Sequence, residues 1–185
     1  MRKDFGAKPM LYPQAVFIIA AYDENGNANA MNVAWGGVAD SNKVFICISN
    51  HKTTENILAR KAFTVSMGTA DQVVACDYVG IVSGHKEPEK MQKAGFHTVK
   101  SRFVDAPIIE ELPMTLECRL ISYDTENDYL FGEVVNVSAD ETVLGEDGKI
   151  DIAKLRPIVF DGVHAAYHVI GEKIGNAFSD GAQLK

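Results

Sequence analysis

Short runs of hydrophobic residues separated by turn-forming residues dominate the first half of the chain. The first run covers residues 15–22 and is rich in β-branched and aromatic side chains, which favours a strand. It stops at residues 23–27, where the pair Asn25-Gly26 is typical of a tight hairpin turn. We therefore expect a returning strand over residues 29–38 and a third strand over residues 44–49, with these three strands as antiparallel neighbours.

The middle of the chain alternates strand-like and helix-like segments. A hydroxyl of Thr53 or Thr54 can cap a helix that runs to about Arg60, because it accepts a hydrogen bond from a free backbone N–H group of the first turn. Gly95 is placed to end a later helix, since glycine readily takes the left-handed conformation found just past helix ends. The predicted elements here are a strand over residues 63–67, a helix over residues 70–78 with Thr69 as its N-cap, and a helix over residues 87–94 with Pro88 in its first turn.

The clearest hairpin of the sequence joins residues 114–123 to residues 129–138. In the first of these segments, Leu116, Cys118 and Leu120 alternate with polar neighbours, which is the period of two expected for a strand with one buried face. The segment therefore predicts a strand that packs one of its faces against the core.

Two short strands, near residues 157–160 and 165–170, and a glycine-rich tail complete the expected elements; we expect this tail to lie on the surface or to cross to a partner. A parallel sheet needs a crossover helix after nearly every strand, whereas the helices here are few and short. The pattern therefore favours a mainly β fold, an antiparallel β-barrel with short helical insertions, over a doubly wound α/β sheet. The length of 185 residues predicts a single domain over residues 1–185.

The charge balance argues against a nucleic-acid surface. The chain has 18 Lys and Arg against 25 Asp and Glu, a formal charge of -7, whereas binding to nucleic acid depends on many contacts between cations and phosphates. The longest purely apolar stretch has eight residues, 15–22, so no membrane-spanning helix is expected, and the first residues do not resemble a secretory signal. We expect a cytoplasmic protein with no nucleic-acid or membrane partner.

Several familiar catalytic patterns are missing. The chain has neither the glycine pattern of a Rossmann dinucleotide site nor that of a P-loop, and neither a serine-hydrolase elbow nor a zinc-protease helix motif. His164 and His168 have a spacing that suits a metal only on a helix, whereas their segment alternates like a strand. The three cysteines are widely spaced in apolar surroundings, so we expect buried free thiols and no metal site.

One candidate site lies at residues 49–56, with the sequence Ser-Asn-His-Lys-Thr-Thr-Glu-Asn. Here a predicted strand ends and a helix begins, so free backbone N–H groups, hydroxyls and either His51 or Lys52 can form a local anion pocket that fits a phosphate. Plain helix capping beside a solvated loop explains the same residues equally well.

A second candidate site lies at residues 29–37, which contain two amides, small residues, the only tryptophan and a glycine pair. Small residues allow the backbone to approach a flat ligand closely, and Gly36-Gly37 permits a bulge. Backbone groups presented in this way can contact the edge of a planar heterocycle. A core tryptophan beside a bulge is the alternative interpretation.

The order of several motifs over nearly the whole chain resembles the flavin reductase-like family, which binds FMN in a split β-barrel, and its flavoredoxin branch in particular. The residues that carry the resemblance are Pro13-Gln14-Ala15-Val16, Asn29 to Trp35, Thr53-Thr54-Glu55-Asn56-Ile57, Phe63-Thr64-Val65-Ser66, Asp77-Tyr78-Val79-Gly80, Ser83-Gly84 with Glu89-Lys90, Leu112-Pro113 with Glu117-Cys118, and Tyr167 to Gly171. The resemblance implies FMN as the cofactor. The site residues that it implies are Met31, Asn32, Val33, Ala34, Trp35, Ser49, His51, Thr53, Thr54 and Lys90.

In that family, the segment that corresponds to residues 31–35 lines the isoalloxazine ring, the segment at 49–54 holds ribityl and phosphate oxygens, and the loop at 83–90 closes over the site. Tyr167 or His168 is expected to border the exposed face of the flavin. The chain departs from many members at Asn32, at His51-Lys52 and at Asn42-Lys43, where they have Thr, Arg-Tyr and Pro-Pro.

The resemblance implies a homodimer with FMN near the subunit interface, and hydride transfer from NAD(P)H through the flavin. No catalytic acid-base pair is expected, because the flavin carries the chemistry. Two other interpretations stay open: an FMN electron carrier that a redox protein reduces, and a non-redox module that keeps the barrel without FMN.

Overall fold

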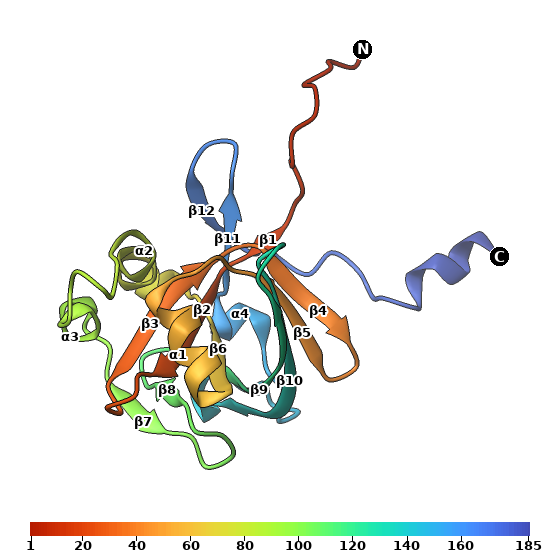
Figure 1. The fold of residues 1–185 in the computed structure, drawn as a ribbon. Helices are drawn as coiled ribbons and strands as arrows, with labels where there is room; N and C mark the ends of the chain where they lie inside the picture. Colours follow the sequence, from red (N-terminus) through yellow and green to blue (C-terminus); the bar gives the residue numbers. More distant parts are fainter.

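The computed structural model describes residues 1–185 and is built around a curled seven-stranded antiparallel sheet (Figure 1). The strands of this sheet, in spatial order, are β3 (Ala28–Val33), β2 (Phe17–Tyr22), β6 (Ala62–Met67), β9 (Met114–Asp124), β10 (Tyr129–Ala139), β5 (Lys43–Cys47) and β4 (Gly36–Asp40). Helices are few and short, so the predicted antiparallel split β-barrel with short helical insertions is confirmed.

The chain passes from one edge of this sheet to the other within two residues. β3 and β4 form the two edges, and only Ala34 and Trp35 separate them in sequence. The sheet must curl to bring its edges this close, which gives the half-closed barrel of Figure 1. The expected continuous strand over residues 29–38 is therefore wrong, because its first half pairs with β2 and its second half with β5.

The expectation that the first three strands are antiparallel neighbours also needs correction. β5 corresponds to the third predicted strand, but it pairs with β10 and β4 and does not pair with β3. A close approach at Gly36 makes this arrangement possible: a Cβ atom there would lie 2.6 Å from the Phe45 carbonyl oxygen. Only glycine avoids that overlap without a shift of the backbone.

Smaller elements complete the fold. The other strands are β1 (Gln14–Ala15), β11 (Ile158–Asp161) and β12 (Ala166–Val169), which form one sheet, and β7 (Thr98–Lys100) and β8 (Pro107–Ile109), which form another. The helices are α1 (Lys52–Arg60), α2 (Val73–Ile81), α3 (Lys90–Ala94) and α4 (Ile152–Leu155), with short 3-10 turns at Ala70–Gln72, Glu141–Val143 and Asp180–Leu184. None of the helices is long and apolar enough to span a bilayer.

Three α-helix starts differ from the prediction. The helix expected over residues 70–78 begins as a 3-10 turn over Ala70–Gln72 with Thr69 as its N-cap, and α2 itself covers Val73–Ile81. The N-cap of α1 is His51, so Thr53 and Thr54 lie inside the first turn; the Thr54 hydroxyl accepts from the His51 N–H and completes a capping box. The third helix begins only at Lys90, because residues 83–89 form turns, whereas Gly95 ends it with φ 73° as expected. The tail after residue 170 is exposed, in agreement with one of the two expectations for it.

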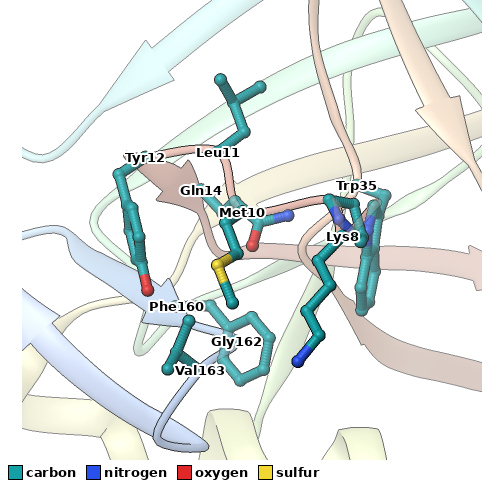
Figure 2. Close-up of a pocket in the computed structure, with 10 residues that line it drawn as sticks. Lys8, Met10, Leu11, Tyr12, Gln14, Trp35, Phe160, Gly162 and Val163 are labelled. Carbon is teal, nitrogen blue, oxygen red and sulfur yellow. The ribbon is translucent and has the colours of Figure 1, made fainter. Parts of the chain in front are cut away.

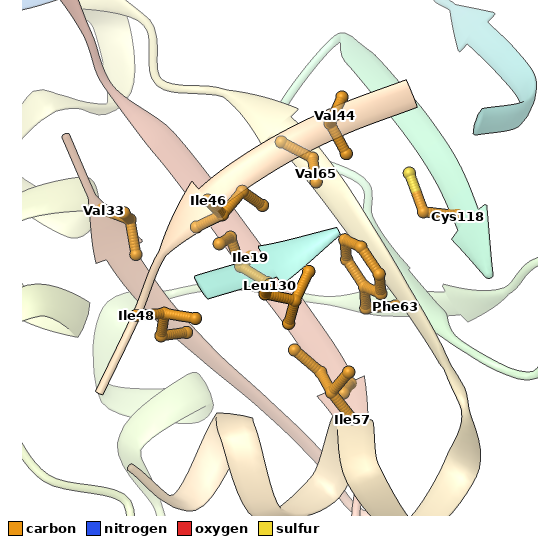
Figure 3. Close-up of a cluster of buried hydrophobic side chains, with 11 residues drawn as sticks. Ile19, Val33, Val44, Ile46, Ile48, Ile57, Phe63, Val65, Cys118 and Leu130 are labelled. Atoms are coloured by element: carbon orange, nitrogen blue, oxygen red, sulfur yellow. The ribbon is translucent and has the colours of Figure 1, made fainter. Parts of the chain in front are cut away.

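Both faces of β2 are buried, which places two cores back to back. Ile19 faces the barrel interior, where it packs in a cluster with Phe63, Leu130 and Ile57 of α1 (Figure 3). Ile18 faces the opposite side, in a second cluster that α2 and α3 cover. Each such fully buried side chain contributes about 1.5–3 kcal/mol. Helix α1 is therefore held against one end of the barrel by its apolar face.

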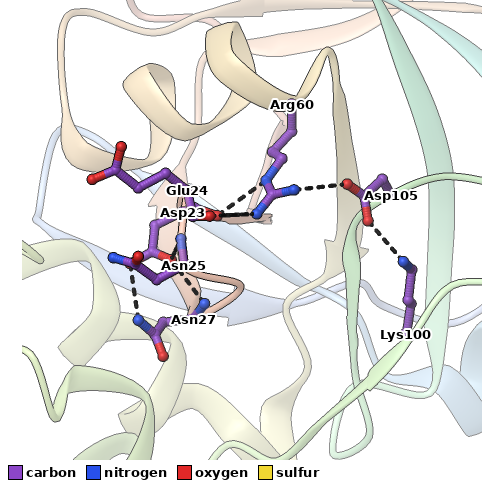
Figure 4. Close-up of polar contacts among 7 residues, drawn as sticks. All are labelled: Asp23, Glu24, Asn25, Asn27, Arg60, Lys100 and Asp105. Carbon is purple, nitrogen blue, oxygen red and sulfur yellow. Dashed lines mark hydrogen bonds and ion pairs between the residues drawn. The ribbon is translucent and has the colours of Figure 1, made fainter.

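Arg60 holds the far end of α1 in place (Figure 4). Its guanidinium donates hydrogen bonds to the Asp23 carbonyl oxygen at 3.0 and 2.6 Å and contacts the Asp105 carboxylate at 3.2 Å. Lys100 reaches the other carboxylate oxygen of Asp105 at 3.0 Å. These contacts join α1 to the turn between β2 and β3, so the helix and β3 keep a fixed relation.

Candidate functional site

Three adjoining hollows meet at Asn32 on strand β3, and the side chain of Asn32 lines all of them. They measure about 180, 310 and 300 Å³. One is bordered by aromatic rings, one by cationic and polar groups, and one mainly by β3 and the end of β5. Together they form one groove along β3, between the start of α1 and the end of α2.

The polar hollow holds a buried cation that has no carboxylate partner. Lys90 is only 3% exposed, and its ammonium forms no ion pair. Burial lowers the pKa of Lys90 to about 8, so the group stays mostly protonated at neutral pH. A buried charge without a partner is costly, which points to an anionic ligand.

The first turn of α1 lines the same hollow through His51, Lys52 and Thr53. The N–H of Glu55 is the first in this helix to bond along it, to the carbonyl oxygen of His51. The earlier N–H groups at a helix start lack acceptors within the helix and carry partial positive charge. Lys90 and the start of α1 thus supply positive charge from two elements.

The walls of this hollow are packed closely. The Asn29 amide donates a hydrogen bond to the Thr53 hydroxyl at 2.6 Å. A Cβ atom at Gly84 would overlap the Asn29 side chain, and one at Gly80 would lie 2.9 Å from Cβ of Asn32. Glycines at these two positions let α2 and the loop that follows it lie directly on β3.

Thr54 lies behind the groove. It is fully buried, its hydroxyl donates to the Ser49 carbonyl oxygen at 2.7 Å, and it accepts from the His51 N–H at 3.4 Å. Its hydrogen-bonding capacity is therefore largely used in shaping the turn before α1. Ser49 and His51 both line the hollow near β5, with 3.1 Å between Ser49 Oγ and His51 Nε2.

The other residues expected at the site lie together. Apart from Thr54, each of them lines at least one of the three hollows: Met31, Asn32, Val33, Ala34, Trp35, Ser49, His51, Thr53 and Lys90. Their contact with a ligand stays a prediction.

The aromatic hollow is bordered by three rings in a row. The centroids of Trp35 and Phe160 are 6.1 Å apart, and those of Phe160 and Tyr167 are 6.0 Å apart. Tyr167 donates to Asp77 at 2.8 Å, and the Asn32 amide donates to the Tyr167 oxygen at 3.4 Å. Burial and the hydrogen bond to Asp77 raise the pKa of Tyr167 to about 12, so its hydroxyl is neutral at physiological pH.

Of the two residues expected to border the flavin, only one lines the groove. Tyr167 lines the aromatic hollow, whereas His168 lies 3.7 Å from Asp161 and lines none of the three hollows. His164 also contacts Asp161, at 2.6 Å, and the chain contains no cluster of three or more potential metal ligands. Cys76 and Cys118 are buried free thiols, as expected, whereas Cys47 is only half-buried.

Sequence reasoning missed Phe160 and Ile81 as parts of the groove wall. Phe160 lies on a strand far along the chain from Trp35, and no local spacing connects the two. Ile81 carries a usable sequence signal, because it ends a helix that is apolar on nearly all sides and cannot bury all of them. In the structure it is 75% exposed.

The groove has a cationic end and an aromatic end, so it suits an elongated ligand with an anionic group and a flat ring. The family model for the flavin reductase like domain matches residues 10–164. The chain belongs to this family. That residues 1–185 form a single domain stays a prediction.

Solved structures agree with this assignment. Flavoredoxin of Desulfovibrio vulgaris (Miyazaki F) is 35% identical, with a TM-score of 0.93 over 98% of this chain and 100% of that one. Flavoredoxin from Methanosarcina acetivorans is 26% identical, with a TM-score of 0.89 over the full length of both chains. An FMN-binding domain of a flavin reductases-like enzyme from Shewanella baltica OS155 is 22% identical, with a TM-score of 0.78 over 88% of this chain and 89% of that one, which shows the shared fold.

Proposed function

We propose that this flavin reductase-like protein binds FMN and transfers hydride from NAD(P)H, through the flavin, to a further acceptor. The observation that carries the proposal is the buried, unpaired Lys90 across the groove from the start of α1. Bound FMN supplies the hydride chemistry, and the chain has to bind, orient and shield it.

The FMN phosphate fits the cationic end of the groove. The Lys90 ammonium and the free N–H groups in the first turn of α1 offer charge-assisted hydrogen bonds to a dianion. His51 and Thr53 line the same hollow, with Thr53 fixed by its hydrogen bond from Asn29. Thr54 supports this end from behind, because its hydroxyl is engaged with Ser49.

The flavin ring fits the other end, along residues 31–35 of the chain. Trp35 and Ala34 offer apolar surface to a flat ring, and the amide of Asn32 lies where the three hollows meet. Asn32 is held by a 3.0 Å hydrogen bond to the carbonyl oxygen of Cys76. The amide nitrogen is thus engaged with Cys76 and Tyr167, and the amide oxygen can accept a hydrogen bond from a ligand without a change of rotamer.

A second copy of the chain is proposed to close this groove. Helix α2 is apolar on nearly all sides, yet Val74 is 81% exposed and Ile81 is 75% exposed. A helix of this kind is normally covered. Because Ile81 also lines two of the hollows, a partner that covers α2 would lie over the groove and exclude water from it.

An FMN electron carrier, reduced by a redox protein, is the alternative. The likeness to the Desulfovibrio vulgaris flavoredoxin favours it, with 35% identity over 98% of this chain. The groove itself serves both functions, because each needs a bound flavin with one accessible edge.

Anaerobic titration tests both proposals. FMN is added to the purified protein under argon, the visible spectrum is recorded, and NADH and then NADPH are added. Bleaching of a bound flavin by either nucleotide is the expected result, and reduction by dithionite alone would favour the carrier. Absence of FMN binding would overturn both functions. Sedimentation of the wild-type protein and of Ile81→Asp tests the second copy, since the charge should produce monomers.

A further inference from the structure

A fourth cavity, the arm pocket, adjoins the aromatic end of the groove and shares Trp35 and Phe160 with it (Figure 2). Its volume is about 420 Å³, within the range of pockets that hold small molecules. The residues that line it are Lys8, Pro9, Met10, Leu11, Tyr12, Gln14, Trp35, Phe160, Gly162 and Val163. The FMN-binding function proposed above leaves this pocket free.

Two residues of the N-terminal arm, Tyr12 and Gln14, attach the arm pocket to the rest of the chain. Gln14 pairs with Phe160 in the small sheet, which anchors the N-terminal arm beside the aromatic row. The Tyr12 hydroxyl donates a 2.5 Å hydrogen bond to Asp161, and the same carboxylate accepts from the Val163 N–H at 2.9 Å. The arm and the turn after β11 are therefore held together through one carboxylate.

The chemistry of the lining selects a particular kind of ligand. Most of the lining is apolar, with the Phe160 and Trp35 rings and the flexible Met10 side chain facing the cavity (Figure 2). Lys8 is its only cation and forms no ion pair, in a chain whose formal charge is -7. Figure 2 shows its side chain extending toward Phe160. An aromatic ring against Phe160 and Trp35, with an anionic substituent at Lys8, satisfies both features.

We propose that the arm pocket binds a flat aromatic molecule with a carboxylate or similar anionic group, as the substrate of the flavoprotein. Because the pocket and the groove share the Trp35 and Phe160 walls, the bound ring lies next to the position proposed for the flavin. The role as a substrate rests on the proposed function, whereas the binding itself does not require FMN.

The only tryptophan of the chain reports on this pocket, since Trp35 is one of its walls. Quenching of Trp35 fluorescence is measured with 4-nitrobenzoate and with 4-nitrobenzamide, which differ in charge and share the ring. Both titrations are done on the apo-protein and on the protein saturated with FMN. We expect saturable quenching by the acid in both forms and weaker binding of the amide.

Two arm variants form a matched pair. Lys8→Met should weaken the binding of 4-nitrobenzoate by about fivefold or more and leave the amide unchanged, because a charge-assisted contact is lost. Lys3→Met removes a cation from the same arm outside the pocket and should change neither affinity. Val163→Phe should fill the cavity and weaken the binding of both compounds.

Three results would overturn the inference. These are the absence of saturable quenching, equal affinity for the acid and the amide, and an affinity for the acid that Lys8→Met leaves unchanged. A pocket covered by a second copy would give the first result, together with protection of Trp35 from acrylamide. Loss of FMN binding with retained binding of 4-nitrobenzoate to the apo-protein would overturn the proposed function alone.

Discussion

The side-chain amide of Asn29 donates a buried hydrogen bond of 2.6 Å to the hydroxyl of Thr53, and thereby ties the start of strand β3 to the first turn of helix α1. The two residues are 8% and 1% exposed, so neither partner can replace this bond with water easily. The bond fixes the cationic end of the groove relative to the strand that carries Asn32.

We expect Asn29→Ala to lower the free energy of unfolding by about 1–3 kcal/mol, because it leaves the Thr53 hydroxyl buried without its donor. It should also weaken FMN binding, since the first turn of α1 loses its fixed position. Urea unfolding and FMN titration measure the two effects. Asn27→Ala, which changes an amide in the exposed turn before β3, is the control. Equal losses in the two variants would contradict the role of the buried bond.

Substitutions at the neighbouring glycines 36 and 37 test how closely β4 packs against β5. A Cβ atom at Gly36 would lie 2.6 Å from the Phe45 carbonyl oxygen, whereas one at Gly37 would meet nothing within 4 Å. We expect Gly36→Ala to destabilise the protein by about 2 kcal/mol or more, since the overlap is with backbone, and Gly37→Ala to change stability by less than about 1 kcal/mol. Thermal unfolding of both variants decides the point; similar melting temperatures would show that β4 is not held this closely.

Local sequence patterns predict most of the strands because alternation and turn residues act over a few positions. The hairpin between β9 and β10 and the turn at Asn25-Gly26 are of this kind. The break between β3 and β4 is not, because it depends on the curl of the whole sheet and on the approach of Gly36 to Phe45. Pairing between distant strands is a property of the closed barrel.

The candidate site could likewise be predicted only where its residues are close together in the sequence. Residues 29–35 and 49–54 are continuous segments, and the sequence identifies them together with the resemblance that they carry. Phe160 and Asp77 join the site only through the pairing of β11 with β1 and the packing of α2. The use of the Thr54 hydroxyl inside the turn likewise depends on where α1 begins, which the spacing of hydroxyls did not reveal.

Lys90→Met should separate binding of the phosphate from binding of the ring. We expect it to weaken FMN affinity by about tenfold or more and to leave riboflavin affinity nearly unchanged, because riboflavin lacks the phosphate. Lys93→Met on the same helix is the control: Lys93 is exposed and paired with Glu87. Flavin fluorescence measures the affinities of the wild type and both variants for FMN and for riboflavin. An equal loss for FMN and riboflavin would place Lys90 away from the phosphate.

The pH dependence of FMN binding follows from the pKa of Lys90, which burial lowers to about 8. As the pH rises through that value, the free protein loses the ammonium charge, so FMN affinity should fall between pH 7 and pH 9 in the wild-type protein. Lys90→Met has no charge to lose there and should show a smaller change. A parallel decline in both proteins would assign the effect to another group.

The same buried ammonium should destabilise the protein without ligand. A lysine whose folded-state pKa lies below its unfolded value binds fewer protons when folded, so stability should rise with pH between about 8 and about 10.5. Below that range the charged group opposes folding. We therefore expect Lys90→Met to raise the unfolding free energy of the apo-protein at neutral pH by about 1–3 kcal/mol. Urea unfolding without flavin measures it, and a loss of stability would contradict the unpaired charge.

Tyr167→Phe tests the aromatic end of the groove. The variant removes the 2.8 Å hydrogen bond to Asp77 and should lower the unfolding free energy at pH 7 by about 1 kcal/mol. The pKa of Tyr167 is raised to about 12, so this stabilisation is present below the unfolded pKa of about 10 and is lost as the pH rises toward 12. The difference between wild type and variant should therefore shrink between pH 9 and pH 11. Urea unfolding at both values measures it, with Tyr129→Phe as an exposed control. A constant difference would show that folding does not raise the pKa of Tyr167.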